Sequence, residues 1–358
     1  MEEFHCKTRI ISGMGAIAAL GELKAKRVFL VADPFFRDNG MAEKVLSAAR
    51  AESSEIFSRI SPDPTVELAA EGTALVRAFQ PDWIIALGGG SAMDCAKAMA
   101  HFSGVEAKLA AIPTTSGSGS EVTDFAILTH QQVKYPLVDK RLTPDVAILD
   151  GALLEKLPRS LVAEGGFDLI SHCLEAYAAK NSGAISDCLA EEAFRTAYAN
   201  LPASFAGNTQ VRLDVHMAAT MAAMAFSQAG LGLCHAMAHS LGGAFHVSHG
   251  KLNAILLPAV IGLNAHAAAG KYAAMARAAG LGGSGDAIGL RNLKNGLIRL
   301  RRDLGLPATL TQAGISEGQL WQKMDSIVEA ALADPCCQSN PLTPEAFMVR
   351  RILEEVTK

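Results

Sequence analysis

Residues 83–100, WIIALGGGSAMDCAKAMA, join an apolar run to an alanine-rich segment through three consecutive glycines. The run WIIAL has the composition of a strand that is buried on both faces, and the segment after the glycines has that of a helix. Glycines at such a turn let the backbone approach a ligand closely, and the start of the helix offers N–H groups to an anion. The stretch therefore predicts an α/β sheet with a phosphate site, although a tight strand-to-helix turn without a ligand explains a lone GGGS string equally well.

Further apolar runs lie in the first 150 residues and are separated by helical segments. They are KRVFLVAD, SEIFSRI, LAAIPTT and VAILD, at residues 26–33, 54–60, 109–115 and 146–150. Strands that alternate with helices in this way build a doubly wound parallel sheet. After the last run, segments rich in Ala, Leu and Met continue to the C-terminus. We therefore expect an α/β dinucleotide-binding domain over residues 1–155 and an all-α metal-binding domain over residues 156–358.

The composition argues against several classes of function. The chain has 358 residues, half of them apolar, and a formal net charge of −4 with scattered basic residues, which does not favour nucleic-acid binding. No apolar run reaches the length of a membrane span without a glycine, polar or charged interruption, and the N-terminus MEEFHCKTR is too polar for a secretory signal. The seven cysteines form no CxxC pair, which favours reduced thiols over a disulfide framework. A soluble, cytoplasmic protein is expected.

A second polar loop, PTTSGSGSEVT at residues 113–123, follows the next strand and is rich in glycine and hydroxyl side chains. Open α/β sheets bind their ligands at the carboxyl ends of neighbouring strands, so the two loops together predict a nucleotide site. Asp33 ends an earlier strand, where a carboxylate can accept hydrogen bonds from a ribose diol and would repel a 2′-phosphate. This favours NAD(H) over NADP(H). A role as the N-cap of the following helix explains Asp33 equally well.

Four side chains in the second half have the composition of a divalent metal site: Asp168, His172, His235 and His249. Asp168 and His172 are four residues apart and would share a helix face. His249 follows the breaker pair Gly242–Gly243, so the chain can fold back there. A lone histidine on an alanine-rich face is usually a packing residue, but an unpaired carboxylate in an apolar stretch is costly. Three imidazoles with one carboxylate suit Fe(II), Zn(II), Mn(II), Co(II) or Ni(II), and a metal site is predicted.

Other side chains near the predicted ligands have less certain roles in the sequence. His239 lies one helical turn after His235 and is not needed to complete the metal site. Imidazole groups in general titrate near neutrality, so His239 could relay a proton between substrate and solvent, and a packing role explains it equally well. Cys173 and Cys234 adjoin predicted ligands, but neighbouring helix residues point about 100° apart. We expect these cysteines to pack behind the site.

Taken together, the motifs RIISGMGAIAAL, PDPT, GGGSAMDCAKAMA, PTTSGSGSEVT and KYPLVD, with the two histidine segments, resemble those of the iron-containing (group III) alcohol dehydrogenases. The resemblance covers nearly the whole chain and implies a dehydroquinate-synthase-like fold. It places the metal ligands on the four residues already named. It places the cofactor contacts on Asp33, Gly88, Gly89, Gly90, Ser91, Asp94, Thr114, Thr115, Ser118 and Lys134.

The resemblance implies reversible interconversion of a small primary alcohol and its aldehyde with NAD(H), with Fe(II), or Zn(II) in its place, acting as a Lewis acid. The histidine segments are most similar to the propanol dehydrogenases of propanediol utilisation. Dehydrogenases of 1,3-propanediol, lactaldehyde or glycerol-type polyols are the alternatives. A homodimer or larger homo-oligomer is expected, with association to a bacterial microcompartment as a further hypothesis.

Two further alternatives belong to other classes of function. A lyase of the same fold that acts on a phosphorylated sugar acid would need several basic residues near the metal, and the ligand segments contain only Lys251. A non-catalytic assembly partner would use the Ala/Met-rich helices for packing alone. Metal analysis and an NADH-linked aldehyde assay separate this last alternative from an enzyme.

Overall fold

The computed structural model describes residues 4–130 and 133–358. The chain divides into two compact units, His5–Leu157 and Pro158–Lys358, and Phe4 is grouped with the second. Each unit has its own architecture and is described separately below.

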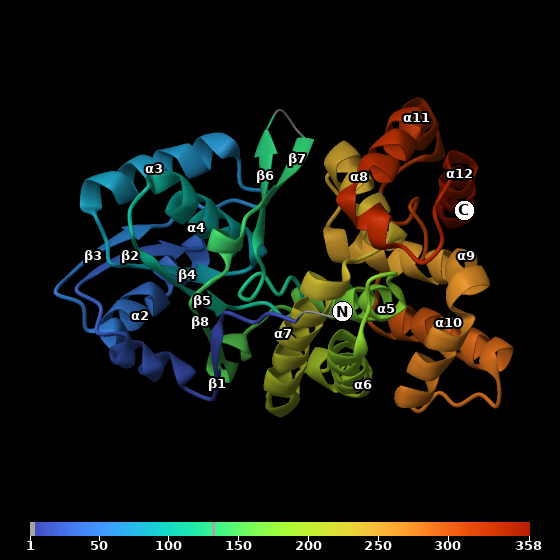
Figure 1. Ribbon diagram of the computed structural model, residues 1–358, viewed down its shortest axis with the longest axis horizontal. Helices are drawn as coiled ribbons and strands as arrows, with labels where there is room; N and C mark the ends of the chain where they lie inside the picture. Colours follow the sequence, from blue (N-terminus) through green and yellow to red (C-terminus); the bar gives the residue numbers. More distant parts are fainter. Residues whose placement is uncertain (1–3, 131–132) are drawn as a thin grey trace. The chain divides into compact units, whose positions relative to one another are not determined.

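The first unit is built on a six-stranded parallel sheet with the strand order β1-β8-β5-β4-β2-β3 (Figure 1). The strands are β1 (Arg9–Gly13), β2 (Arg27–Ala32), β3 (Ser53–Phe57), β4 (Trp83–Gly88), β5 (Lys108–Pro113) and β8 (Val146–Asp150). From β2 the chain moves outward to β3, and β4 then returns to the other side of β2. The strand order therefore reverses between β2 and β4, and the crevice at the carboxyl ends of such neighbours is where doubly wound sheets bind ligands.

Helical segments cover both faces of this sheet. They are η1 (Ala16–Leu23), α1 (Pro34–Asp38), α2 (Met41–Ala49), α3 (Val66–Phe79), α4 (Gly90–Ser103), η2 (Lys140–Leu142) and η3 (Gly151–Leu154). Along β4, Ile84 belongs to a buried cluster with Met99 of α4, and Ile85 belongs to the opposite cluster with Val45 of α2. The five apolar runs of the sequence analysis are all strands with buried residues, and the predicted doubly wound sheet is confirmed.

Three strands were not predicted. β1 lies at an edge of the sheet and is largely exposed, so it lacks the continuous apolar run of a central strand. β6 (Phe125–His130) and β7 (Val133–Val138) form a separate antiparallel pair. Pro136 lies inside β7, opposite Ile127, and proline cannot donate a ladder hydrogen bond, which weakens the strand signal in the sequence.

The second unit is helical, and residues 158–358, all of which the structure describes, contain no strand. Its elements are α5 (Arg159–Ala178), α6 (Ala184–Phe205), η4 (Thr209–Val211), α7 (Arg212–Ala229), α8 (Leu233–Phe245), α9 (His249–Ala278), α10 (Asp286–Asp303), α11 (Glu317–Ala333), η5 (Pro335–Ser339) and α12 (Ala346–Thr357). α5 is buried continuously over residues 166–176 and packs against α6, α7 and α9. A helix that is buried all round is a core helix, and α5 is the centre of this unit.

Among the described residues, α9 is long and apolar enough to cross a membrane by length and composition alone. However, 67% of its most apolar window is buried inside the fold. The segments Thr209–Ala229 and Leu233–Phe245 meet the same test only as one broken span bent by 103°. Core helices of folded proteins also pass this test, so these segments are weak evidence for a membrane span.

Candidate metal centre and cofactor loops

The structure brings the four predicted metal ligands together within the helical unit. Asp168 and His172 lie on consecutive turns of α5, His235 lies in the first turn of α8, and His249 is the first residue of α9. The Nε2 atoms of His172, His235 and His249 lie 3.7, 3.5 and 3.4 Å from Asp168 Oδ1. Ligand atoms that share one ion at about 2.1 Å in a tetrahedral arrangement are about 3.4 Å apart. These four residues are called the Asp168 cluster below. The ligand atoms of Asp168, His235 and His249 all lie within 4.8 Å of one another, whereas His172 approaches Asp168 but is not part of that group. The donor types of all four residues suit a divalent cation.

Helix packing explains how His249 reaches α5. The next residue, Gly250, lies so close to α5 that an added Cβ would be 2.1 Å from the carbonyl oxygen of Glu164. Only glycine permits this approach. On the other side of the cluster, the His172 ring stacks between Phe226 and His235, with ring centroids 4.4 and 4.5 Å away. The imidazoles are thus fixed by packing, and the side chain of His249 alone is substantially exposed, at 31%.

The charges in the Asp168 cluster are strongly coupled. Burial raises the pKa of Asp168, but the neighbouring His172 and His249 outweigh it and hold this pKa well below its usual value. Burial lowers the pKa of His235, yet the hydrogen bonds to Asp168 and Glu175 raise it to about 9. Desolvation by the surrounding groups, together with the neighbouring imidazoles, holds the pKa of His249 well below its usual value, although part of the side chain is exposed. An ionised Asp168 and a neutral His249 are the forms that a cation requires, whereas a metal bound at His235 must displace the proton that the raised pKa retains.

Polar residues that the sequence analysis did not single out surround this cluster. Asn253 Nδ2 donates to Asp168 Oδ1 at 2.9 Å and lies 3.4 Å from His235 Nε2. Glu175 Oε2 accepts a hydrogen bond from His235 Nδ1 at 2.5 Å. A signal for Glu175 was present, because it follows Asp168 by seven residues on the same face of an apolar helix. Asn253 carried no comparable signal.

His239 lies beside the Asp168 cluster. Its ring stacks on that of His249 with centroids 5.1 Å apart, and its side chain is 23% exposed. His239 Nδ1 is hydrogen bonded to Asp334 Oδ2 at 2.8 Å. The ligand atoms of these two residues and of Cys336 all lie within 4.8 Å of one another. This is a position from which an imidazole can exchange protons with solvent. Proton relay by His239 stays a prediction.

The two cysteines next to predicted ligands are both buried. The Cys234 thiol donates to Asn253 Oδ1 at 3.6 Å. Burial raises the pKa of Cys173, so this thiol stays protonated at neutral pH. Among the described residues, the ligand group that contains Asp168 includes neither cysteine.

In the first unit, the glycine triplet lies against both neighbouring loops. Each glycine abuts one of them: Gly88 against Asp33, Gly89 against Thr115 and Gly90 against Ser118. An added Cβ would approach these side chains to between 3.2 and 3.4 Å. The structure therefore brings together the loops at the carboxyl ends of β2, β4 and β5, beside the point where the strand order reverses.

Several predicted cofactor residues also make hydrogen bonds within the protein. The N–H of Thr114 donates to the carbonyl of Gly88 at 2.9 Å, which joins the two loops directly. Asp33 Oδ1 accepts from the N–H of Phe35 at 3.0 Å, so the N-cap role offered as the alternative is present. The N-cap of α4 is Gly89, which has no side chain to cap the start of the helix, and Ser91 is the second residue. The N–H groups there remain suited to a phosphate.

The charged groups of Asp94 and Lys134 make hydrogen bonds or an ion pair within the protein. Asp94 Oδ1 accepts from Ser120 Oγ at 2.8 Å and its Oδ2 accepts from the N–H of Ile127 at 3.1 Å. Lys134 Nζ pairs with Asp63 at 2.6 Å. Burial raises the pKa of Asp94. These contacts suit Asp94 to holding the second loop in place beside the glycine triplet.

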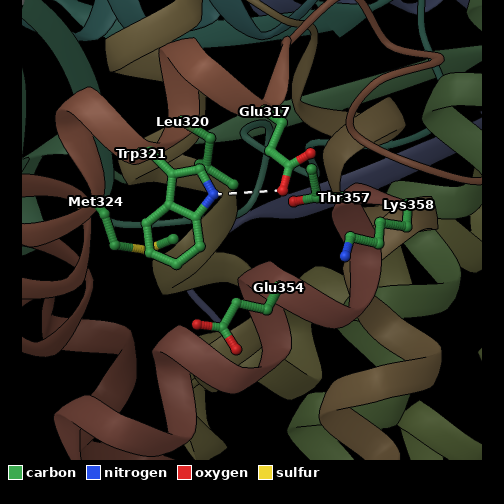
Figure 2. A pocket seen from close by; sticks show the side chains of 7 residues that line it. All are labelled: Glu317, Leu320, Trp321, Met324, Glu354, Thr357 and Lys358. Atoms are coloured by element: carbon green, nitrogen blue, oxygen red, sulfur yellow. Dashed lines mark hydrogen bonds between the residues drawn. The ribbon is translucent and has the colours of Figure 1, made fainter.

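A separate pocket of about 260 Å³ lies between α11 and the end of the chain (Figure 2). Its lining consists of Glu317, Leu320, Trp321, Met324, Glu354, Thr357 and Lys358. Trp321 Nε1 donates to Glu317 Oε1 at 3.5 Å. None of the predicted site residues lines this pocket, and we assign it no part in the chemistry.

Comparison with known proteins identifies the family. The family model described as iron-containing alcohol dehydrogenase matches residues 7–151, and that described as Fe-containing alcohol dehydrogenase family, C-terminal, matches residues 162–357. The chain belongs to the iron-containing alcohol dehydrogenase family. The resemblance inferred from the sequence motifs is therefore confirmed.

Individual relatives extend over the whole chain. It is 39% identical to the 1-propanol dehydrogenase PduQ of Citrobacter freundii, covering 99% of this chain and 100% of that protein. It is 37% identical to an NADPH-dependent butanol dehydrogenase of Clostridium saccharobutylicum, covering 99% and 97%. Among solved structures, the iron-containing alcohol dehydrogenase of Thermococcus thioreducens superposes with a TM-score of 0.92 at 33% identity, covering 99% of both chains.

These matches confirm both the fold and the class of activity. The α/β unit followed by a helical unit is the dehydroquinate-synthase-like fold predicted from the sequence. The chain is an oxidoreductase of the family that interconverts alcohols and aldehydes. Membership of this family favours a dehydrogenase over the lyase and the non-catalytic assembly partner.

Proposed function

We propose that the chain interconverts a small primary alcohol and its aldehyde, of the propanol and propionaldehyde type, with NAD(H) and a divalent iron ion. The observation that carries the proposal is the convergence of three imidazole Nε2 atoms on Asp168 Oδ1 at 3.4 to 3.7 Å. The proposed metal ligands are Asp168, His172, His235 and His249. The similarity to 1-propanol dehydrogenases supports a short primary alcohol as the substrate.

The proposed cofactor site lies in the N-terminal domain, residues 1–155, and the proposed metal site in the helical domain, residues 156–358. The adjacent loops at the carboxyl ends of β2, β4 and β5 supply backbone N–H groups for the phosphates of NAD(H). The carboxylate of Asp33 supports NAD(H) over NADP(H), because it would repel a 2′-phosphate. One relative is named for NADPH, so the coenzyme preference of this chain has to be measured.

The proposed chemistry assigns a task to each side chain. A divalent ion bound by the Asp168 cluster supplies Lewis acidity toward an alcohol or aldehyde oxygen. Asp168 supplies negative charge that holds the cation, and Asn253 fixes Asp168 by donating to its Oδ1. The hydrogen bond from His239 to Asp334 orients the His239 ring, whose other nitrogen can then accept and release a proton.

The association state and location of the protein are proposals that rest on the family resemblance. We propose a homodimer or a larger homo-oligomer in the cytoplasm, with recruitment to a bacterial microcompartment. Light scattering of the purified protein tests the first. Cell fractionation tests the second.

Elemental analysis combined with a substrate scan tests the proposed function. Protein purified without oxygen should contain about one iron ion per chain and oxidise NADH with aldehydes of two to four carbons. His249→Ala should lose metal and turnover together. His266→Ala, an exposed histidine on the same helix, is the matched control and should retain both. Full turnover in a metal-free His249→Ala protein would refute the proposal.

A further inference from the structure

Glu175 is a buried carboxylate on α5 that is hydrogen bonded to the start of α8. Its side chain is 3% exposed. Oε2 accepts from the N–H of Gly232 at 3.1 Å and of His235 at 3.3 Å, and Oε1 accepts from the N–H of Cys234 at 2.7 Å. Oε2 also accepts from His235 Nδ1 at 2.5 Å. One side chain thus satisfies three backbone donors that a helix start leaves without partners, and also orients an imidazole.

The bond to His235 fixes which ring nitrogen carries a proton. An ionised carboxylate only accepts hydrogen bonds, so Nδ1 of His235 must be the donor. In the neutral ring, the lone pair is then on Nε2, which lies 3.5 Å from Asp168 Oδ1. Two groups with lone pairs at this separation need a cation or a proton between them. Glu175 thereby selects the form of His235 that can bind a metal through Nε2.

Gly232 makes room for this arrangement. Its φ of −152° is extended and open to any residue, so backbone conformation does not require a glycine there. An added Cβ would instead lie 2.6 Å from Glu175 Oε1 and 2.8 Å from Asn340 Oδ1. Asn340 Oδ1 accepts from the N–H of Leu233 at 3.1 Å and so caps the same helix, and the other side-chain hydrogen bonds of Asn340 join it to Asn264 and Leu342. The helix start therefore has two separate side-chain caps, of which one also contacts a proposed ligand.

We propose that Glu175 is a positioning residue for the metal centre, which holds His235 in the Nδ1–H form and aims its Nε2 at the Asp168 cluster. The inference rests on the proposed function, because it needs a metal bound by this cluster. It goes further, since it makes the metal affinity depend on a residue that is not itself a ligand. A helix cap without influence on the metal is the alternative, and Asn340 provides a residue of that kind for comparison.

Glu175→Gln tests the proposal with little change in shape. The amide must present its NH₂ group either to the donors at Oε2, which include His235 Nδ1, or to the N–H of Cys234, so donors face each other in either orientation. We expect the affinity of metal-stripped protein for Zn²⁺ or Co²⁺, measured by competition with a chelator, to fall by about 10- to 100-fold. Asn340→Ala should lower the melting temperature but change the affinity by less than about threefold. Equal losses in both variants, or none in Glu175→Gln, would overturn the proposal.

A spectroscopic measurement on the unaltered protein keeps the proposal testable if Glu175→Gln does not fold. In zinc-loaded protein labelled with ¹⁵N-histidine, His235 should show a hydrogen-bonded proton on Nδ1 and zinc on Nε2. Zinc on Nδ1, with the proton on Nε2, would contradict the assigned role. Absence of zinc binding by the unaltered protein would instead refute the proposed function, so the two failures are distinguishable.

Discussion

Replacing Gly250 by alanine should weaken metal binding without touching a ligand. The added Cβ would lie 2.1 Å from the carbonyl oxygen of Glu164 and 2.6 Å from its carbonyl carbon. Both atoms are backbone, so no side-chain rotation relieves the overlap. Carbon atoms in contact lie about 3.5 Å or more from their neighbours, so α9 must move away from α5 by about 1 Å.

The displacement is large on the scale of a coordination bond. His249 is the residue before Gly250, and its Nε2 lies 3.4 Å from Asp168 Oδ1. Ligand distances in metal sites vary by only about 0.2 Å, so a shift of about 1 Å at His249 should remove one ligand. We expect at least a tenfold loss of metal affinity. Overpacking of this kind should also lower the free energy of unfolding of the metal-free protein by about 1–3 kcal/mol.

Gly318 provides a matched control for this substitution. Both glycines are the second residue of a helix with a serine N-cap, and an added Cβ on Gly318 would meet nothing within 4 Å. Gly318→Ala should be neutral or stabilise by up to about 1 kcal/mol, because alanine is the better helix former. The measurements are urea unfolding of metal-free protein and chelator competition for Zn²⁺. If Gly250→Ala matches Gly318→Ala in both, the close approach of α9 to α5 does not position His249.

Three further predictions concern His239, Asp33 and Lys97. His239→Asn should lower kcat by about 100-fold and alter the pH–rate profile while metal content stays unchanged. An unaltered profile would eliminate the relay. Asp33→Ser keeps an N-cap but removes the negative charge. The kcat/KM for NADP⁺, divided by that for NAD⁺, should therefore rise at least about tenfold. An unchanged ratio would show that Asp33 does not select the cofactor. Burial lowers the pKa of Lys97 to about 8, so above pH 8 the folded state loses a proton that the unfolded chain keeps to about pH 10.4. The free energy of unfolding, measured with urea relative to Lys97→Met, should therefore rise by about 1 kcal/mol from pH 7 to pH 9. A difference that stays flat or falls would contradict this prediction.

The sequence was sufficient for the central strands because each is buried on both faces and has a continuous apolar run. β1 escaped prediction since an exposed edge strand lacks such a run, and Pro136 masked β7. These elements are defined by their pairing partners. Composition along a single segment does not report such partners.

The predicted metal ligands could be identified because imidazoles and a carboxylate are unusual in apolar helices and two of them share a helical spacing. The carboxylates that are hydrogen bonded to His235 and His239 could not be identified from the sequence. Glu175 is 60 residues from His235, and Asp334 is 95 residues from His239. Contacts at such separations depend on how α5, α8 and η5 pack, and no local pattern in the sequence encodes them.

Metal binding by the Asp168 cluster is tested most directly by an X-ray structure of protein purified without oxygen, with anomalous differences collected at the iron edge. We predict one peak within about 2.3 Å of Asp168 Oδ1 and of the Nε2 atoms of His172, His235 and His249. A peak bound by other residues, or no peak in crystals of active protein, would contradict it.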